Sequence, residues 1–225
     1  MSKELIAKLF EFTKDVEVKG QKLYLRIPGD HVVEEARRES LLESRKLRRA
    51  LRTPDTDDYL IHIDPVEDYE KSDIITMCIS LGMRDVMRTY MQTHPKPQLE
   101  LLGDNPSLED QERYEAAKLQ RDIDYNEDMR IHVESWRDSY SKSLEKLDIE
   151  QVKNAYKRSK TERVCEDLYS REFEDRIMTY SVFSDKDHMN PAFTLDEYRN
   201  LPSNIKTLLQ EEYGTLSLGV DDLKK

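Results

Sequence analysis

The chain has 225 residues and a mass of 26.7 kDa, which is enough for a sizeable core without disulfides or metals. Charged and hydrophobic residues each make up 37% of it, against about 25% and 45–50% in an average soluble domain. Its apolar runs are far shorter than the roughly 20 residues that a membrane-spanning helix needs, which excludes such a helix. Six glycines and eight prolines are too few for a Gly-rich nucleotide-binding fold, a collagen-like chain or a turn-rich β-sandwich. The composition predicts a soluble, mainly α protein.

The formal charge is −11, but residues 1–53 are net positive, with 13 basic and 9 acidic side chains. Bulk nucleic acid and anionic membranes are therefore expected to repel most of the chain. Cys78 and Cys165 lie in separate helix-like segments without CxxC spacing, so both are predicted to be buried and neither a disulfide framework nor a zinc site is indicated. The N-terminus lacks the basic-then-apolar pattern of a signal peptide, which favours a cytoplasmic protein.

The first elements change from helical to strand periodicity. Residues 3–12 have a helical apolar stripe, and residues 16–27 alternate as a β-hairpin, with Lys19-Gly20 supplying a turn residue that tolerates positive φ. An isolated hairpin is marginal in water, so flanking helices or another subunit must cover its apolar face. Residues 31–52 follow as a helix capped by Asp30.

The stripe expected to face the core in the 31–52 helix is Val33, Leu41, Leu47 and Leu51. Residues 59–63 are predicted to form a short strand. Asp64-Pro65 then opens the most hydrophobic helix, which ends at His94-Pro95 and is where we place the core.

Two long helical segments follow, one from the Ser107 cap to about 147 and one from Asp148 to about 180. With a turn at Leu147-Asp148 they predict a long antiparallel helical hairpin. Thr194 caps a short helix, and a last helix is expected to stop at Gly214. The predicted fold is mainly α, with an N-terminal β-hairpin plus a helical domain that contains the long hairpin. The expected divisions are 1–106 (hairpin and helical core), 107–182 (long helical hairpin) and 183–225 (short helices).

Two features are candidates for binding a partner. The basic cluster Arg45, Lys46, Arg48, Arg49 and Arg52 could grip phosphates or an acidic partner, or could be a solvated helix end neutralised by Asp55, Asp57 and Asp58. The methionine series Met77, Met83, Met87 and Met91 has roughly helical spacing, which suits either a core stripe or an adaptable groove.

No pattern identifies a catalytic or metal site. GxxxxGK[ST], GxGxxG, GxSxG and HExxH do not occur, and the five histidines are scattered. Two carboxylate groups, one at Asp64, Glu67 and Asp68 and one at residues 122–128, lack the alternating oxygens and central glycine of an EF-hand. No enzymatic activity, no catalytic residue, no metal and no cofactor are therefore expected.

The sequence also resembles a known family at both ends. Residues 16–28, VEVKGQKLYLRIP, followed by a charged helix rich in Glu and Arg, are similar to the start of the tail assembly chaperones of tailed bacteriophages. The stretch from Phe193-Thr194 through Leu201-Pro202 to Leu208-Leu209 resembles the short closing helices of phage morphogenesis proteins. This likeness implies a non-enzymatic helper that coats the tape-measure protein before the tail tube polymerises.

We therefore expect an assembly or interaction protein that binds a protein partner, such as a tape-measure or other tail protein, and forms a homo-oligomer. The alternatives are a structural virion or scaffold component, and a nucleic-acid-associated regulator that uses the basic helix 37–52, although nucleic acid is the less favoured partner. An enzyme of unrecognised type is also left open. The expected partner-binding residues are Arg45, Lys46, Arg48, Arg49, Arg52, Met83, Met87, Met91, Trp136 and Tyr140.

Overall fold

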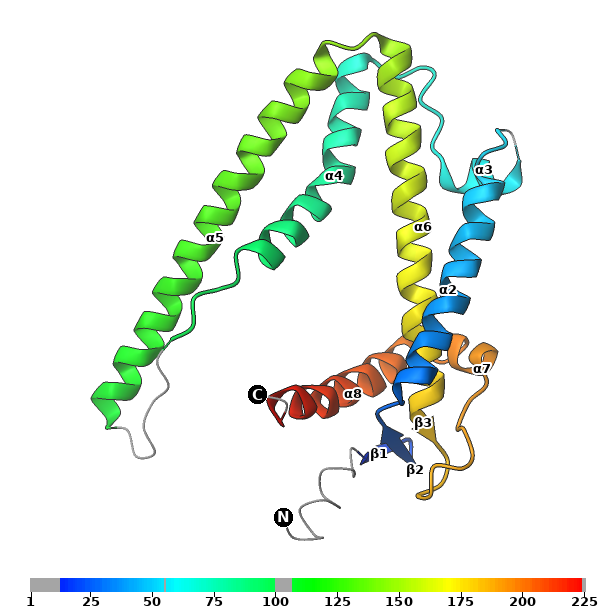
Figure 1. Cartoon of the computed structure of the whole chain (residues 1–225), viewed down its shortest axis with the longest axis vertical. Coiled ribbons are helices and arrows are strands. Elements are labelled where there is room, and N and C mark those ends of the chain that lie inside the picture. Colours follow the sequence, from blue (N-terminus) through cyan, green and yellow to red (C-terminus); the bar gives the residue numbers. More distant parts are fainter. Residues whose placement is uncertain (1–12, 55, 100–106, 224–225) are drawn as a thin grey trace. The chain divides into compact units, whose positions relative to one another are not determined.

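The computed structural model describes residues 13–54, 56–99 and 107–223, with side chains as far as residue 217 (Figure 1). The fold is mainly α with one small sheet, as the sequence predicts. The predicted helix at 3–12 and Asp55 lie outside the described residues. The elements are β1 (Thr13–Val18), β2 (Gln21–Arg26), α2 (Asp30–Ala50), α3 (Asp57–His62), α4 (Lys71–Thr93), α5 (Leu108–Glu145), α6 (Ile149–Ser181), β3 (Val182–Phe183), α7 (Leu195–Arg199) and α8 (Ser203–Leu223).

The chain forms two compact units that do not follow the three expected divisions. Unit 1 combines the chain up to Thr53 with the chain from Val164 onward, and unit 2 is Pro54–Arg163. The difference arises because the N-terminal hairpin buries its apolar face against C-terminal elements rather than against the segment that follows it. Helix α6 begins in unit 2 and ends in unit 1.

The sheet of unit 1 has the order β1-β2-β3, with both pairs antiparallel. Lys19 and Gly20 form the predicted two-residue turn, and both have positive φ (51° and 81°), which the twist of a tight hairpin requires. As predicted, flanking helices cover the apolar face of the hairpin; they are α6, α7 and α8. The resulting core consists of Val16, Leu23, Leu25, Met178, Val182, Tyr198, Ile205 and Leu209.

Helix α2 also packs in unit 1, through a face that includes three of the four residues of the predicted stripe: Leu51, just past the end of the helix, is 4% exposed, and Val33 and Leu47 are partly buried. Ala36, Ser40 and Ser44, which follow one another at intervals of four, are the buried residues within α2, whereas Leu41 is 39% exposed. The Ser44 hydroxyl donates a 2.8 Å hydrogen bond to the Cys165 carbonyl of α6. Small side chains bring α2 close enough for that bond, so a leucine at these positions would not fit. Gly29, rather than Asp30, occupies the N-cap.

Unit 2 is built around α4, where the sequence placed the core, but unit 1 has a second core that contains no residue of α4. The core of unit 2 consists of Val66, Ile74, Ile75, Cys78, Leu144, Val152 and Tyr156. The chain reverses at the predicted turn, since α5 ends at Glu145 and Asp148 exchanges capping hydrogen bonds with Gln151 at the start of α6. However, α4 lies between the two long helices (Figure 1) and contacts both, through Gly82 against Trp136 of α5 and through Asp85 with Arg163 of α6.

Three local predictions are wrong. Residues 57–62 are helical rather than a strand, because the Thr56 hydroxyl caps them by accepting from the Tyr59 amide. Helix α4 begins at Lys71, six residues after Asp64-Pro65; Asp64 instead accepts hydrogen bonds from Tyr156 (2.7 Å) and Lys160 (2.9 Å). Helix α8 continues past Gly214 to Leu223.

None of the helices in the described part of the chain combines the length and apolar content needed to cross a membrane.

Candidate functional site

The predicted basic cluster lies on α2, on the side away from the buried small residues. Arg38, Leu42, Arg45 and Arg49 follow one another at steps of four and three residues, which places them along one face of α2, and Arg52 continues the series in the turn just after the helix ends at Ala50. All four arginines are exposed, and Leu42 among them is 48% exposed. We call these five residues the arginine stripe.

The arginines of the stripe differ from neighbouring charges in having no ion-pair partner in the part of the chain that the structure describes. Lys46 pairs with Glu43 at 2.7 Å, and Arg37 pairs with Glu34. No carboxylate of the described residues lies within ion-pair distance of the stripe's four arginines. Of the five predicted basic residues, Arg45, Arg49 and Arg52 therefore belong to the stripe, while Lys46 and Arg48 do not.

Arg48 has an internal role that its sequence position did not indicate. Its side chain lies near the Cys165 thiol in unit 1 and affects the ionisation of that thiol. Burial raises the pKa of this thiol, and Arg48 lowers it by a smaller amount. Both cysteines are buried and neither forms a disulfide, as predicted.

A second stripe of matching spacing lies on α5. Leu108, Glu112, Glu115, Leu119 and Ile123 share one face of this helix, and all are exposed; the exposed fractions of Leu108, Leu119 and Ile123 are 78%, 64% and 51%. The Glu115 carboxylate forms an ion pair with the Lys118 ammonium, with Oε2 3.6 Å from Nζ. Glu112 has no ion pair with a described residue. We call this the acidic stripe. The sequence analysis missed it because its leucines and glutamates resemble an ordinary solvated face.

The other predicted partner-binding residues lie in unit 2. Met83 and Met87 are partly buried, and Met91 is 49% exposed. The Trp136 ring stacks on Tyr140 with ring centroids 5.1 Å apart and packs against Gly82. These two aromatic residues therefore hold α5 against α4.

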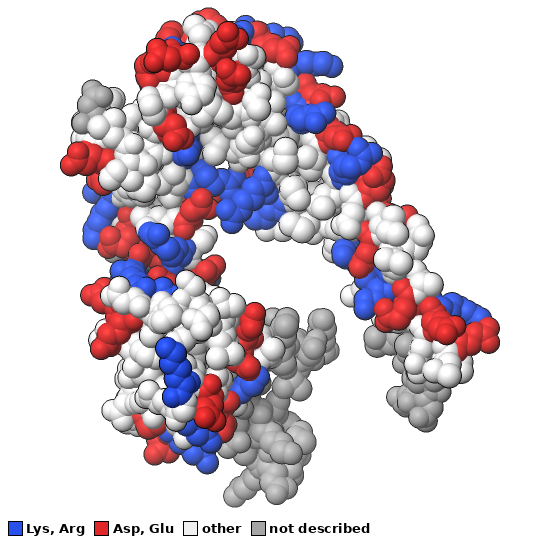
Figure 2. Space-filling model, turned by 180° about the vertical axis from the view of Figure 1, so that it is seen from behind, with Lys and Arg blue, Asp and Glu red and all other residues white. Residues whose placement is uncertain are grey.

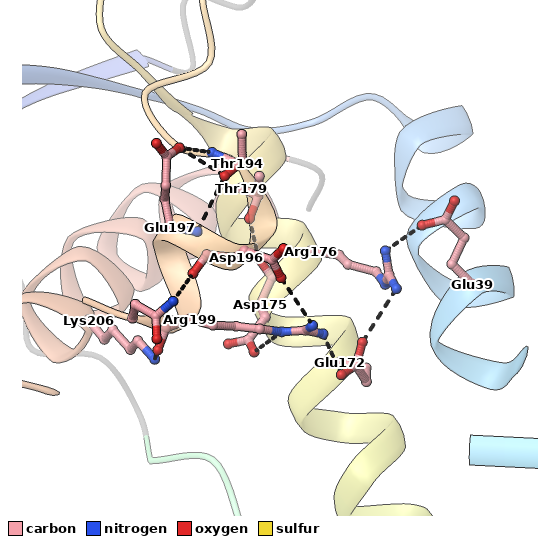
Figure 3. A network of polar contacts seen from close by, with 11 residues as sticks. Glu39, Glu172, Asp175, Arg176, Thr179, Thr194, Asp196, Glu197, Arg199 and Lys206 are labelled. Atoms are coloured by element: carbon pink, nitrogen blue, oxygen red, sulfur yellow. Dashed lines mark hydrogen bonds and ion pairs between the residues drawn. The ribbon is translucent and has the colours of Figure 1, made fainter. Parts of the chain in front are cut away.

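A network of ion pairs in unit 1 was not anticipated from the sequence. Glu172 and Asp175 of α6 are 7% and 8% exposed. Arg176 bridges Glu172 (3.4 Å) and Glu39 of α2 (2.5 Å), while Arg199 of α7 pairs with Glu172 and with Asp175 (3.5 Å), as Figure 3 shows. A cavity of about 350 Å³ opens beside it. Each carboxylate faces a guanidinium, so the network serves to join α2, α6 and α7.

Positive and negative side chains are interspersed over the face seen in Figure 2. No group of three or more His, Cys, Asp or Glu side chains among the described residues is arranged to hold a metal ion. No protein family, curated protein or solved structure matches the chain.

Proposed function

We propose that this chain is a non-enzymatic interaction protein that assembles by docking the arginine stripe of one copy onto the acidic stripe of a second copy. The observation that carries the proposal is the set of four exposed arginines, three along α2 and Arg52 in the turn after it, without a carboxylate partner among the described residues. Solvated surface charges usually alternate in sign, whereas this row has one sign in a chain of net charge −11.

The two stripes complement each other in charge and in spacing. Arg49 and Leu42 are seven positions apart, and so are Glu112 and Leu119. This spacing corresponds to about 10.5 Å along the axis of each helix. Antiparallel docking therefore places Arg49 opposite Glu112 and Leu42 opposite Leu119. In the same arrangement Arg45 lies opposite position 116 of the other helix, one residue from Glu115. The half-exposed leucines would be buried at the centre, with charged pairs around them.

This contact joins two different surfaces, so it is heterologous. Repeating it produces a ring if the rotation closes and a filament if it does not, which suits an assembly protein. Charged pairs at an exposed interface are screened by salt. We therefore expect the oligomer to weaken as the sodium chloride concentration rises.

The test is light scattering after size-exclusion chromatography, over a range of protein concentrations. The wild-type chain should form a defined oligomer, and the Arg45→Glu/Arg49→Glu variant should be monomeric. Adding Glu112→Arg and Glu115→Arg to that variant should restore the oligomer, because all four charges are then exchanged. Arg158→Glu, at an exposed position of α6, is the matched control and should not change the mass.

A wild-type chain that is monomeric at every concentration would exclude the proposal. An oligomer that survives Arg45→Glu/Arg49→Glu would place the interface elsewhere, with Met83, Met87 and Met91 as the next candidates. Labelled oligonucleotide that binds the wild type and not the double variant would favour the nucleic-acid alternative.

The resemblance of residues 16–28 and 193–209 supports a narrower proposal, in which the assembly is that of a phage tail and the tape-measure protein is a further partner. In unit 1 the hairpin and the closing helices meet in one core. A reducing cytoplasm is the location that we propose, and the two unpaired cysteines suit it. Co-purification with a tape-measure protein, lost in Arg45→Glu/Arg49→Glu, tests this version.

A further inference from the structure

The exposed face of the sheet in unit 1 carries a cavity of about 520 Å³ with a basic lining. The hairpin contributes Lys22 and Arg26 on this face, and the loop after β3 contributes Lys186; Lys14 also borders the cavity, but its side chain lies on the Leu25 face of the hairpin. Asp15 and Asp187 are the carboxylates of the lining, so the cations outnumber them. A positive cavity is unexpected in a protein of this negative charge.

Two of the cations are neutralised and two are not. Lys22 pairs with Asp15 at 2.6 Å, and Lys14 pairs with Glu212. Arg26 stacks over the Phe183 ring at 5.1 Å and has no ion pair with a described residue. Lys186 likewise has none. The guanidinium and this ammonium are therefore available to an anionic ligand.

His188 adds a strained and unsatisfied group to the same cavity. Its φ is 55°, a conformation that is costly for a residue other than glycine. The Asp185 carboxylate holds the loop in place by accepting from the amides of Met189 (3.1 Å) and Asn190 (2.7 Å).

The imidazole of His188 is fixed edge-on against two aromatic rings. Its centroid lies 5.1 Å from that of Phe183 and 6.4 Å from that of Tyr24. The Nε2 atom is buried and has no hydrogen-bond partner. Burial, with Arg26 nearby, lowers the pKa of His188, although Asp185 and Asp187 oppose the shift. The His188 ring therefore forms a fixed part of the cavity wall, and its Nε2 atom is closed to solvent.

We propose that this cavity binds a small phosphate-type oxyanion, held by Arg26 and Lys186, with the His188 ring in the cavity wall beside it. A guanidinium can donate two hydrogen bonds to such an anion, and the ammonium adds a point charge. This inference does not depend on the proposed assembly, because none of these residues belongs to either stripe.

The test is a titration of the full-length chain with inorganic pyrophosphate at constant ionic strength, followed by the NMR signals of the His188 ring. A His188→Gln variant identifies those signals. The expected result is a saturable shift. Arg26→Gln/Lys186→Gln should weaken binding by about tenfold or more, since charged hydrogen bonds are lost. Both residues are exposed, so the variant should keep the wild-type amide spectrum.

Arg158→Gln is the matched control, because it removes an exposed arginine of α6 that belongs neither to the cavity nor to either stripe, and it should bind pyrophosphate with unchanged affinity. A shift that rises linearly without saturation would overturn the proposal, as would equal affinity in Arg26→Gln/Lys186→Gln. Either of these results leaves the assembly proposal unaffected.

Discussion

The hydroxyl of Ser44 donates a 2.8 Å hydrogen bond to the backbone carbonyl of Cys165 and so connects α2 directly to the main chain of α6. Ser44 is 7% exposed and belongs to the small-residue face with Ala36 and Ser40. Because this narrow face is the one that is buried, the opposite side of α2 presents the arginine stripe to solvent. The position of a serine thus decides which surface is available for a partner.

Replacing Ala36 by leucine should force α2 away from its neighbours, because Ala36 is fully buried. Overpacking of this kind costs about 1–3 kcal/mol, so the free energy of unfolding should fall by that amount. Urea unfolding followed by far-UV circular dichroism measures it. Leu41→Ala, at a 39% exposed position of the same helix, should change stability by less than about 0.5 kcal/mol. Equal losses in the two variants would contradict the packing described.

Two glycines in helices should respond in opposite ways to alanine. A Cβ on Gly214 meets nothing within 4 Å, so Gly214→Ala should stabilise the protein by up to about 1 kcal/mol through helix propensity. A Cβ on Gly82 would lie 2.8 Å from the Trp136 ring. Gly82→Ala should therefore destabilise the protein by about 1 kcal/mol or more, although alanine has the same advantage in helix propensity there. Thermal unfolding compares the two, and stabilisation by Gly82→Ala would refute the close contact.

The Asp64 cluster should make stability depend on pH in acid. Hydrogen bonds from Lys160 and then Tyr156 lower the pKa of Asp64 below its ordinary value of 3.8. The unfolded state therefore binds the proton more tightly, and the stabilisation present above pH 3.8 is lost as the pH falls through the folded-state pKa. Asp64→Asn should lower stability by less than about 1 kcal/mol at pH 7, because the pair is largely exposed.

The measurement is the difference in unfolding free energy between wild type and Asp64→Asn from pH 7 to pH 2. That difference should shrink below pH 3.8. Tyr156→Phe keeps the ion pair with Lys160 and should retain most of the pH dependence. A difference that stays constant down to pH 2 would show that the cluster does not form.

Tyr198 is fully buried, and its hydroxyl has no hydrogen-bond partner. Removal of an unsatisfied hydroxyl relieves a desolvation penalty, so Tyr198→Phe should stabilise the protein by about 1 kcal/mol. Burial, with Asp175 and Glu174, raises the pKa of Tyr198 to about 12. Because that pKa is raised in the folded state, the wild type should lose stability between pH 10 and pH 12 relative to the variant. Destabilisation by Tyr198→Phe at pH 7 would indicate a hydrogen bond instead.

Local patterns predicted those elements that depend on neighbours in the chain. The Lys19-Gly20 turn, the Ser107 and Thr194 caps and the reversal at Leu147-Asp148 all form where expected. Each is decided by hydrogen bonds or φ preferences within about four residues. The same local reasoning was wrong at two places. Residues 59–63 were expected to be a strand, but Thr56 caps a helix there, and α8 continues through Gly214 instead of ending at it.

The sequence by itself therefore determined a charge-dense, mainly α chain with an N-terminal hairpin and a basic helix. Only the tertiary structure decided that Ala36, Ser40 and Ser44 face inward, that the hairpin is covered by C-terminal helices, and that Arg26, Lys186 and His188 line one cavity. These relationships join residues more than 100 positions apart. They depend on which surfaces fit together closely, and periodicity along the chain carries no information about that fit.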